Sequence, residues 1–387
     1  MKNVLFFNLN RITYQGGAES YIIDIGNKLL ESGRPVVYIG DFRIILKLFV
    51  IIGFLLRNIS FSKCKKIIKE INHYPVTDEN KIKFSISSIT VKFICPFSLQ
   101  RRKIKSLVKE SATIFVKNEF IDMMFFWLFM PKPEKKYAII FTSIKYPETK
   151  TFRAKIHNLF YLGSIYKFFL KRYDGLIVSN MADYDLLISH FKINKEKIIY
   201  IPYGLDFDEF RKKKIDFDIS GLKEEKRKIL FVGRLEEQKG IEDLIKIISK
   251  ANKSENNYQF IIIGDGPLKE KIEKLSREQE NVIYLGAKQH GEVLGIYEKA
   301  DIIVVLSRWE TFCYVALEAQ LSGKPVLAYD VSGPNEIILD GVSGKIIKGD
   351  WKEMLKNLDV DYNFDKNYFA YKFSQDRVLE KYRAILN

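Results

Sequence analysis

Cysteine and histidine are scarce in this sequence. Its 387 residues include only three cysteines, Cys64, Cys95 and Cys313, and four histidines. The cysteines lie far apart without metal-ligand spacing, so the sequence predicts neither a disulfide framework nor a zinc site. A reducing compartment is the expected environment. The chain also has no internal repeat, no low-complexity tract and no cleavable signal pattern in its first residues, which we expect to form a strand instead.

Apolar runs long enough to cross a bilayer, which needs about 20 residues, are also missing. Two shorter apolar segments, residues 44–56 and 120–130, are each followed by lysines. The first is predicted to be either a buried core helix or a helix lying in the membrane interface, with its basic flanks on lipid headgroups. Because residues 120–130 repeat the pattern, the sequence favours a peripheral membrane protein.

Charge is distributed unevenly along the chain. The net charge is +15. Residues 1–205 carry 33 basic and 16 acidic side chains, whereas residues 206–387 carry 30 and 32, so the first half holds the whole excess. A positive half-protein implies an anionic partner, such as lipid headgroups, a pyrophosphate-linked carbohydrate or nucleic acid. Charge alone does not choose among these partners.

The element pattern is that of an α/β protein with two domains. A hydrophobic content of 47% with 29% charged residues is typical of a folded chain, and its length suits two cores. Residues 3–8, 20–31 and 36–40 predict a strand–helix–strand opening with the turn Gly16-Gly17 after the first strand. From residue 228 onward strands and helices alternate, which predicts a parallel sheet with its ligands at the carboxyl ends of the strands.

Several motifs follow the predicted strands of the second half. Residues 228–232 lead into Gly233-Arg234 and Lys239, and residues 259–263 lead into Gly264. The buried strand 301–306 precedes Glu310, and a helix predicted over 312–321 carries Glu318. Free N–H groups at the start of that helix attract phosphate, while carboxylates accept hydrogen bonds from sugar hydroxyls. This combination predicts a nucleotide-sugar site.

In order and spacing, these motifs resemble the donor half of the family 4 retaining glycosyltransferases. The resemblance implies the GT-B fold, with two Rossmann-like domains that face each other across a cleft. We expect an acceptor-binding domain at 1–205, a linker at 206–227 and a donor-binding domain at 228–365. A closing helix, residues 366–387, is expected to pack back on the first domain.

The same resemblance implies roles for individual residues. Arg234 and Lys239 would neutralise the diphosphate leaving group without a metal, and Glu310 would contact the donor sugar, so these three are the expected catalytic residues. Glu318 would hold the ribose, and Gly17 would let the first domain close over the diphosphate. The full donor-binding set comprises Gly16, Gly17, Gly233, Gly264, Phe312, Cys313, Tyr314, Val315 and Glu318.

The sequence departs from the family pattern in two places. The usual Glu-Gly-Phe-Gly is Glu310-Thr-Phe-Cys313 here, which predicts a narrower pocket. The histidine usual in the first domain is missing, and Lys145 or Tyr146 is the acceptor-side candidate for its place. His157, the nearest histidine, is expected to be structural. Four Asp-X-Asp triplets are scattered along the chain without a fixed position after a strand, so we expect no metal and no other cofactor.

The expected function is therefore transfer of a hexose or N-acetylhexosamine from a nucleotide-diphosphate sugar, with UDP as the carrier. The acceptor would be a lipid-linked saccharide in surface-polysaccharide synthesis, at the cytoplasmic face of the cell membrane. One alternative is a soluble transferase with a small acceptor. A remote alternative is a basic nucleic-acid-binding protein, but no aromatic-basic interleaving supports it, so no nucleic-acid partner is expected.

Overall fold

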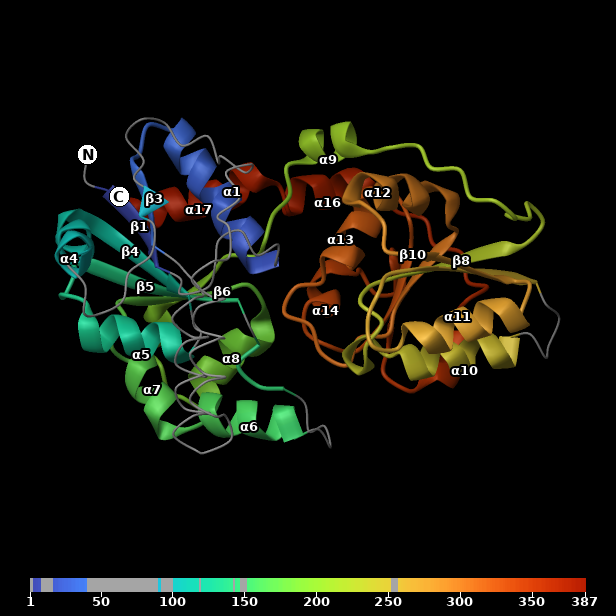
Figure 1. Ribbon diagram of the computed structural model, residues 1–387, viewed down its shortest axis with the longest axis horizontal. Helices are drawn as coiled ribbons and strands as arrows, with labels where there is room; N and C mark the ends of the chain where they lie inside the picture. The colour runs from blue at the N-terminus through green and yellow to red at the C-terminus, as the bar shows by residue number, and fades with distance from the viewer. Residues whose placement is uncertain are drawn as a thin grey trace, which may run out of the picture.

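The computed structural model describes residues 3–7, 17–39, 90–91, 100–117, 120–141, 143–146, 152–251 and 257–387. Within them the chain forms two parallel β-sheets, each covered by helices on both faces (Figure 1). The two α/β domains lie side by side, and the amino and carboxyl ends of the chain both lie on the first domain. The α/β architecture expected from the sequence is confirmed.

The first sheet has the strand order β3-β2-β1-β4-β5-β6-β7. Its strands are β1 (Asn3–Phe7), β2 (Val36–Ile39), β3 (Thr90–Val91), β4 (Ser111–Lys117), β5 (Lys135–Ile140), β6 (Gly175–Val178) and β7 (Ile198–Tyr200). Its helices are α1 (Gly17–Glu31), α4 (Gln100–Glu110), α5 (Phe120–Phe129), α6 (Phe152–Tyr161), α7 (Ser164–Leu170) and α8 (Met181–Ser189), with the 3-10 turn η1 (Lys195–Lys197).

Alternate residues of each strand build different cores, as the two-residue period of a strand requires. In β1, Val4 and Phe6 pack on the face covered by α1, whereas Leu5 and Phe7 pack on the opposite face. That opposite face is covered by α5 and α7, with α6 beyond them (Figure 1). Because the sheet is buried on both faces, its strands are apolar almost throughout.

The second sheet has the order β10-β9-β8-β11-β12-β13. Its strands are β8 (Arg227–Val232), β9 (Tyr258–Ile263), β10 (Val282–Gly286), β11 (Ile302–Val305), β12 (Val326–Tyr329) and β13 (Gly344–Ile347). Its helices are α10 (Ile241–Ala251), α11 (Lys269–Glu278), α12 (His290–Lys299), α13 (Tyr314–Leu321), α14 (Pro334–Ile337) and α15 (Trp351–Lys356), with the 3-10 turn η2 (Glu237–Lys239).

The strand order reverses between β8 and β11, which are neighbours in space but not in sequence. The carboxyl edge of the sheet at such a reversal of strand order is the usual ligand position in these folds. Both predicted motif loops, after residue 232 and after residue 306, begin at this point. The topology alone thus brings Arg234, Lys239 and Glu310 to one edge.

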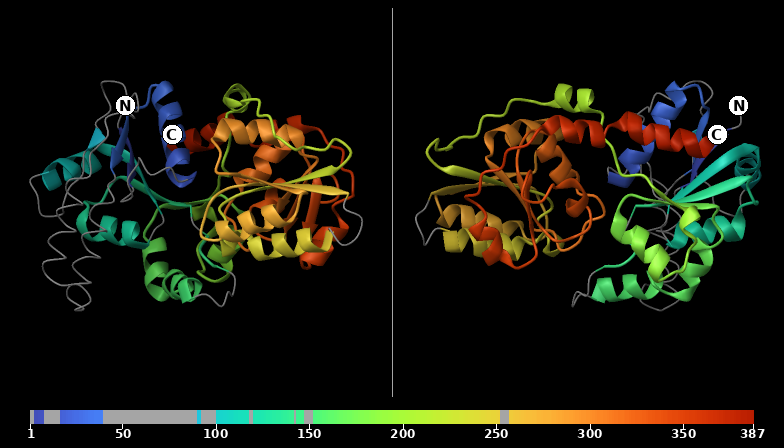
Figure 2. Two further views of the ribbon diagram at one scale, coloured as in Figure 1. Left: turned by 45° about the vertical axis from the view of Figure 1, so that its right-hand side comes forward. Right: turned by 180° about the vertical axis from the view of Figure 1, so that it is seen from behind.

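Two crossings of the chain join the domains. The outgoing crossing contains α9 (Phe207–Lys213), and the returning one is divided into α16 (Lys366–Lys372) and α17 (Gln375–Leu386), where a single helix was expected. The N–H of Leu205 donates to Phe373 O (3.0 Å), and the N–H of Gln375 donates to Leu205 O (3.1 Å), so the crossings hold each other. Helix α16 packs on α13, and α17 crosses to pack on α1 (Figure 2).

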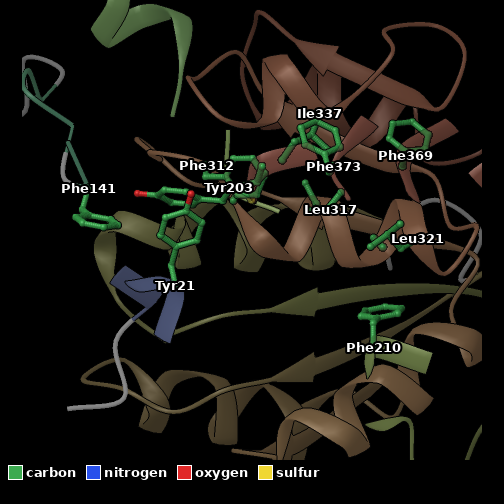
Figure 3. Close-up of a cluster of buried hydrophobic side chains, with 14 of the residues drawn as sticks. Tyr21, Phe141, Tyr203, Phe210, Phe312, Leu317, Leu321, Ile337, Phe369 and Phe373 are labelled. Carbon is green, nitrogen blue, oxygen red and sulfur yellow. The ribbon is translucent and has the colours of Figure 1, made fainter. Parts of the chain in front are cut away.

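Aromatic side chains from both domains fill the space between them (Figure 3). The ring of Tyr203 lies 4.6 Å from Tyr21 and 5.1 Å from Phe312, measured between centroids. Tyr21 also donates a hydrogen bond from its hydroxyl to that of Tyr382 in α17 (3.3 Å). The first domain, the second domain and the returning helix thus share one core.

The two apolar segments have different outcomes. Residues 44–56 lie outside the described residues. Residues 120–129 form α5, which buries Met123 and Phe126 against the sheet and leaves Trp127 and Leu128 exposed. Over the residues that the structure describes, no helix combines the length and the apolar character that crossing a membrane requires.

Candidate active site

The loops after β8 and β11 approach each other closely, and a glycine makes this possible. Gly240 has a φ of +71°, and a Cβ at this position would lie 2.2 Å from Leu306 O. Any side chain would therefore push the two loops apart. The loops are also joined directly, because the N–H of Arg308 donates to Gln238 O (2.8 Å) and Gln238 Nε2 donates to Trp309 O (3.1 Å).

An ion pair between Lys239 and Glu310 lies where these loops meet. Ser307 Oγ donates to Glu310 Oε1 over 2.8 Å, which fixes the carboxylate further. The side chains of Lys239 and Glu310 are 19% and 12% exposed, so water screens their attraction only weakly. Burial alone would lower the pKa of Lys239, but the Glu310 carboxylate more than offsets this and raises it. Lys239 is therefore a fixed positive charge.

Arg234 lies on the same loop but extends outward. Its side chain is 68% exposed, and its guanidinium contacts Glu236 at 2.7 Å. Such an exposed pair is worth little and is easily exchanged for another anion. Arg234 is thus a positive charge that can move toward a ligand in the crevice.

A cavity of about 330 Å³ opens between the domains beside the Lys239–Glu310 pair. The first domain contributes Phe141, and the start of the outgoing crossing contributes Tyr203. The second domain contributes the other lining residues of the cavity, which come from η2, from the turn before α13 and from the start of α13: Lys239, Glu310, Thr311, Phe312, Cys313, Tyr314 and Val315. The first N–H groups of α13 have no acceptor within the helix, so they form a site suited to an anion.

Cys313 precedes α13 in an unusual backbone conformation. Its φ of +73° and ψ of +74° are left-handed, a region that favours glycine. The helix consequently begins at Tyr314, two residues later than the sequence predicted. Burial raises the pKa of the Cys313 thiol to about 12. The thiol therefore stays protonated at neutral pH and is a packing group rather than a nucleophile.

Glu318 lies one turn into α13 and is buried, with 8% of its surface exposed. Tyr297 donates from its hydroxyl to Glu318 Oε2 (3.2 Å), and His290 Nε2 donates to Glu318 Oε1 (2.8 Å). The hydrogen bond to Glu318 raises the pKa of His290 despite the opposing effect of its partial burial. Two of the four or so acceptor positions of the carboxylate are occupied, and the others remain for a ligand.

A second, smaller cavity of about 220 Å³ also has Glu310 in its lining. Its walls come from both domains: Phe141, Ser143, Tyr146, Arg234, Gln238, Trp309, Glu310 and Thr311. Ser143 Oγ donates to Glu310 O (3.2 Å), and the rings of Tyr146 and Trp309 lie 5.3 Å apart, so the domains touch along this wall. Glu310 lines both cavities, together with Phe141 and Thr311.

The acceptor-side candidates differ in placement. Tyr146 lines the smaller cavity, whereas Lys145 is exposed and lines neither cavity. His157 lies behind Tyr146, with the ring centroids 3.7 Å apart, and its Nε2 donates to Ser143 O (3.0 Å). His157 thus supports the cavity wall without lining it.

The Asp-X-Asp triplets are used in several different ways. Asp183 is buried and accepts from the N–H of Ile144 (3.0 Å), and Asp206 caps α9 by accepting from the N–H of Glu209 (3.0 Å). Asp361 pairs with Arg227, and Asp216 pairs with Lys299. Among the described residues, no three His, Cys, Asp or Glu side chains converge in a way that could hold a metal ion.

Residues 212–360, which contain both motif loops and α13, match the family model described as Glycosyl transferases group 1. The match covers the second domain. A 41.2 kDa protein of the cps region of Klebsiella pneumoniae is 34% identical over 55% of this chain and 58% of its own length. An alpha-D-kanosaminyltransferase from Streptomyces kanamyceticus is 31% identical over 31% of this chain and 32% of its own length. These matches thus span only part of the relatives.

Solved structures match the whole chain. A sucrose-phosphate synthase from Thermosynechococcus elongatus has a TM-score of 0.70 at 16% identity, covering 100% of this chain and 98% of its own. HepE from Anabaena, solved in complex with UDP-glucose, has a TM-score of 0.65 at 16% identity, covering 100% and 99%. The expected GT-B fold, with two Rossmann-like domains, is confirmed.

The glycines of the expected donor set have distinct positions. In the second domain, a Cβ on Gly264 would lie 1.8 Å from Gly233 O, so the loops after β8 and β9 meet there. Gly233 itself has more room, since its nearest neighbours are carbons of Lys239 at 3.7 Å. Gly17 is the first residue of α1, and Gly16 lies outside the described residues.

Sequence reasoning missed several residues of the site, among them His290, Trp309 and Tyr297. His290 begins α12 at the carboxyl edge of β10, and it is one of only four histidines, a signal that could have drawn attention to it. Trp309 directly precedes Glu310 in the loop after β11. Tyr297 gave no signal, because its contact with Glu318 depends on how α12 packs against α13.

Proposed function

We propose that this chain is a retaining glycosyltransferase that uses a nucleotide-diphosphate sugar, with UDP as the carrier. It would move a hexose or an N-acetylhexosamine to a lipid-linked saccharide in surface-glycan synthesis. One observation carries the proposal: Glu310 lines both cavities and is held by Lys239 at the amino end of α13. A sugar bound at this wall would face its diphosphate on one side and its acceptor on the other.

The larger cavity is suited to the diphosphate. The N–H groups of residues 312–315 would receive phosphate oxygens at the positive end of α13. Lys239 supplies a fixed charge beside them, and exposed Arg234 can bind two oxygens at once when it leaves Glu236. With two cations and a helix end, charge on the departing diphosphate is neutralised by the chain's own groups, so we propose that no metal is required.

Glu318 would hold the ribose. A buried carboxylate with free acceptor positions can accept hydrogen bonds from two adjacent hydroxyls. His290 and Tyr297 orient it, so the carboxylate need not be ordered when the nucleotide binds. The UDP-glucose complex of the Anabaena protein, which shares the fold, supports a uridine nucleotide as the first ligand to test.

The smaller cavity is suited to the acceptor sugar. Tyr146 and Trp309 line it with aromatic rings, and Ser143 and Gln238 line it with polar groups, in the combination typical of small-molecule sites. In the proposed step, an acceptor hydroxyl oxygen bonds to the anomeric carbon on the face from which the diphosphate leaves. The bond to the phosphate oxygen breaks, and that oxygen takes the hydroxyl proton. The product keeps the donor's anomeric configuration.

The scarcity of cysteine supports a reducing, cytoplasmic location for this reaction. The basic first half supports an anionic partner, which we take to be the membrane surface that carries the acceptor.

The proposal is tested with a panel of nucleotide sugars and calorimetry. We expect UDP to bind, and Glu318→Gln to weaken its binding by about 1–3 kcal/mol, because a charged hydrogen bond to the ribose is lost. Glu280→Gln, on an exposed loop of the same domain, is the matched control and should leave UDP affinity unchanged. Product configuration, read by NMR, should match that of the donor.

Two results would contradict parts of this proposal. Equal UDP affinity in Glu318→Gln and the wild type would remove Glu318 from the ribose site. Failure of every nucleotide sugar to bind or to be consumed would overturn the transferase assignment itself.

A further inference from the structure

Exposed apolar side chains are concentrated on one face of the first domain. Thirteen large hydrophobic residues are exposed among the described residues, and seven of them lie on α5, α6 and α7. All seven are at least 38% exposed, and we term them the apolar face: Trp127, Leu128, Ile156, Leu159, Phe160, Ile165 and Phe168. Three short helices thus carry more than half of the exposed apolar side chains.

These side chains are neighbours in space. Helix α7 contacts both α5 and α6, and all three lie on the side of the first sheet opposite to α1 and α17 (Figure 1). The rings of Trp127 and Phe168 are 5.3 Å apart. The apolar face is therefore continuous from α5 to α7, and contiguous apolar surface of this kind marks an interaction site.

Helix α6 is amphipathic with its apolar stripe turned outward. Ile156, Leu159 and Phe160 follow the i, i+3, i+4 spacing of one helix face, and they are 39%, 74% and 51% exposed. Ala154 and Tyr161, on the other side, are buried against the domain. A helix that only covers a core would expose polar groups at these three positions instead.

The charge around the apolar face is of one sign. Residues 152–172, which span α6 and α7, contain five basic residues and no aspartate or glutamate. Lys155 and Lys171 are exposed, and the guanidinium of Arg172 lies 3.2 Å from the centroid of the Phe168 ring. Apolar side chains bordered by cations suit the headgroup region of an anionic bilayer, because the apolar side chains can enter the acyl boundary while the cations contact the anionic headgroups.

We propose that the apolar face docks on an anionic lipid bilayer. The main alternative occupant of the apolar face is a second copy of the chain. Dimerisation through this face would bring together five basic residues from each copy, and neither α6 nor α7 has an acidic residue to neutralise them. An anionic bilayer accepts both the cations and the apolar side chains. This inference deepens the proposed function by giving the acceptor a membrane source.

The position of the face relative to the active site strengthens the inference. His157 of α6 stacks on Tyr146, which lines the smaller cavity. Phe160 is three residues further along the same helix, about 5 Å along its axis. Docking through α6 would therefore bring the acceptor side of the cleft close to the membrane surface, where a lipid-linked saccharide projects from the headgroups.

The test is co-flotation of the full chain with vesicles of phosphatidylcholine containing phosphatidylglycerol. We expect binding that is weak on pure phosphatidylcholine and only partly reversed by high salt, since the inserted side chains are not screened. Leu159→Ser with Ile165→Ser should lower the partition coefficient at least about tenfold, because apolar area is no longer buried in the bilayer. The control pair Val342→Ser with Tyr371→Ser changes two exposed hydrophobic residues that lie away from the apolar face and should have no effect.

A charge arm separates electrostatic attraction from insertion. Lys155→Glu with Lys171→Glu should weaken binding at low salt, whereas Lys250→Glu with Lys274→Glu on α10 and α11 should not. Unchanged flotation of the Leu159/Ile165 variant overturns the proposal. So does light scattering that finds a dimer in the wild type and a monomer in this variant, since the face would then bind a second copy.

Measuring nucleotide binding distinguishes failure of the docking proposal from failure of the proposed function. UDP calorimetry on the Leu159/Ile165 variant should match the wild type, because these residues lie outside both cavities. Vesicle binding without binding of UDP or of any nucleotide sugar in the panel would overturn the transferase proposal and leave the docking face supported. UDP binding without vesicle binding would overturn the docking proposal, leave the transferase proposal supported and favour a water-soluble acceptor.

Discussion

Cys313 holds a backbone conformation that most side chains avoid. Its left-handed φ of +73° allows α13 to begin at Tyr314, with its first N–H groups directed at the larger cavity. For a residue with a Cβ, this conformation costs roughly 1–2 kcal/mol. The cost is borne beside the expected diphosphate position, as is common for strain at functional sites.

Because of this strain, we expect glycine at position 313 to give a more stable protein than alanine, the inverse of the usual order. Alanine normally stabilises a chain relative to glycine, but here alanine retains the strain and glycine removes it. We expect Cys313→Gly to be more stable than Cys313→Ala by about 1 kcal/mol in urea unfolding. Both variants lose the buried sulfur, so the comparison isolates the backbone. If Cys313→Ala is the more stable variant, the left-handed conformation is not a source of strain.

The motifs identified which side chains carry the chemistry of the site better than they identified which residues those side chains contact. Glu310, Lys239 and Glu318 were identified from their places in motifs, and the structure brings the first two into contact. Ser143 was not identified, because its contact with Glu310 O spans 167 positions and depends on how the domains meet. Such contacts leave no periodic trace in a sequence.

Among the elements, the α12–α13 pair is held by a hydrogen bond from a histidine to a carboxylate. His290 begins α12, and the hydrogen bond to Glu318 of α13 raises its pKa above the ordinary value of about 6.5. Lys213 of α9 opposes this effect. Because the folded pKa exceeds the unfolded one, protonated His290 stabilises the fold. That contribution is complete below about pH 6.5 and is lost as the pH rises through the folded value.

The consequence is a pH-dependent difference between variants. We expect His290→Gln to reduce the free energy of unfolding more at about pH 5.5 than at about pH 8.5, as measured in urea. The matched control is His190→Gln in the first domain, which has no contact with Glu318 and should not reproduce this pattern. A constant difference across this pH range would show that the His290–Glu318 contact carries no charge.

The sequence located the strands better than the helix ends. Apolar runs bounded by glycine or charged residues predicted β1, β8 and β9 to within one or two residues, because strands buried on both faces carry a strong signal. The break between α16 and α17 was missed. It arises where Leu205, more than 160 positions earlier, hydrogen-bonds to Phe373 and Gln375, which is a tertiary cause.

At the scale of the whole molecule, Glu336 joins the two domains. It belongs to α14 of the second domain and accepts hydrogen bonds from Tyr200 OH and from the N–H of Met181, both at 2.7 Å, in the first domain. Burial raises the pKa of Glu336, although both hydrogen bonds oppose this. Together with the contact between Ser143 and Glu310, this carboxylate closes the cleft.

Removing this carboxylate should open the molecule. We expect Glu336→Ala to shift the domain equilibrium by about 1–3 kcal/mol, the usual value of hydrogen bonds to a charged group. The measurement is small-angle X-ray scattering without ligand, in which the radius of gyration should increase. The control is Glu280→Ala, which removes an exposed carboxylate from the same domain. Scattering curves that coincide for Glu336→Ala and the wild type would assign closure to the aromatic core instead.

The positions of the three tryptophans give the molecule its own optical reporters. Trp309 lines the smaller cavity beside Tyr146, Trp127 belongs to the apolar face, and Trp351 begins α15, which packs on α10 away from both. Fluorescence therefore originates at the cleft, at the docking surface and at a reference point that takes part in neither ligand binding nor lipid binding. Variants that retain one tryptophan each would resolve ligand entry and lipid contact as separate signals, without any added dye.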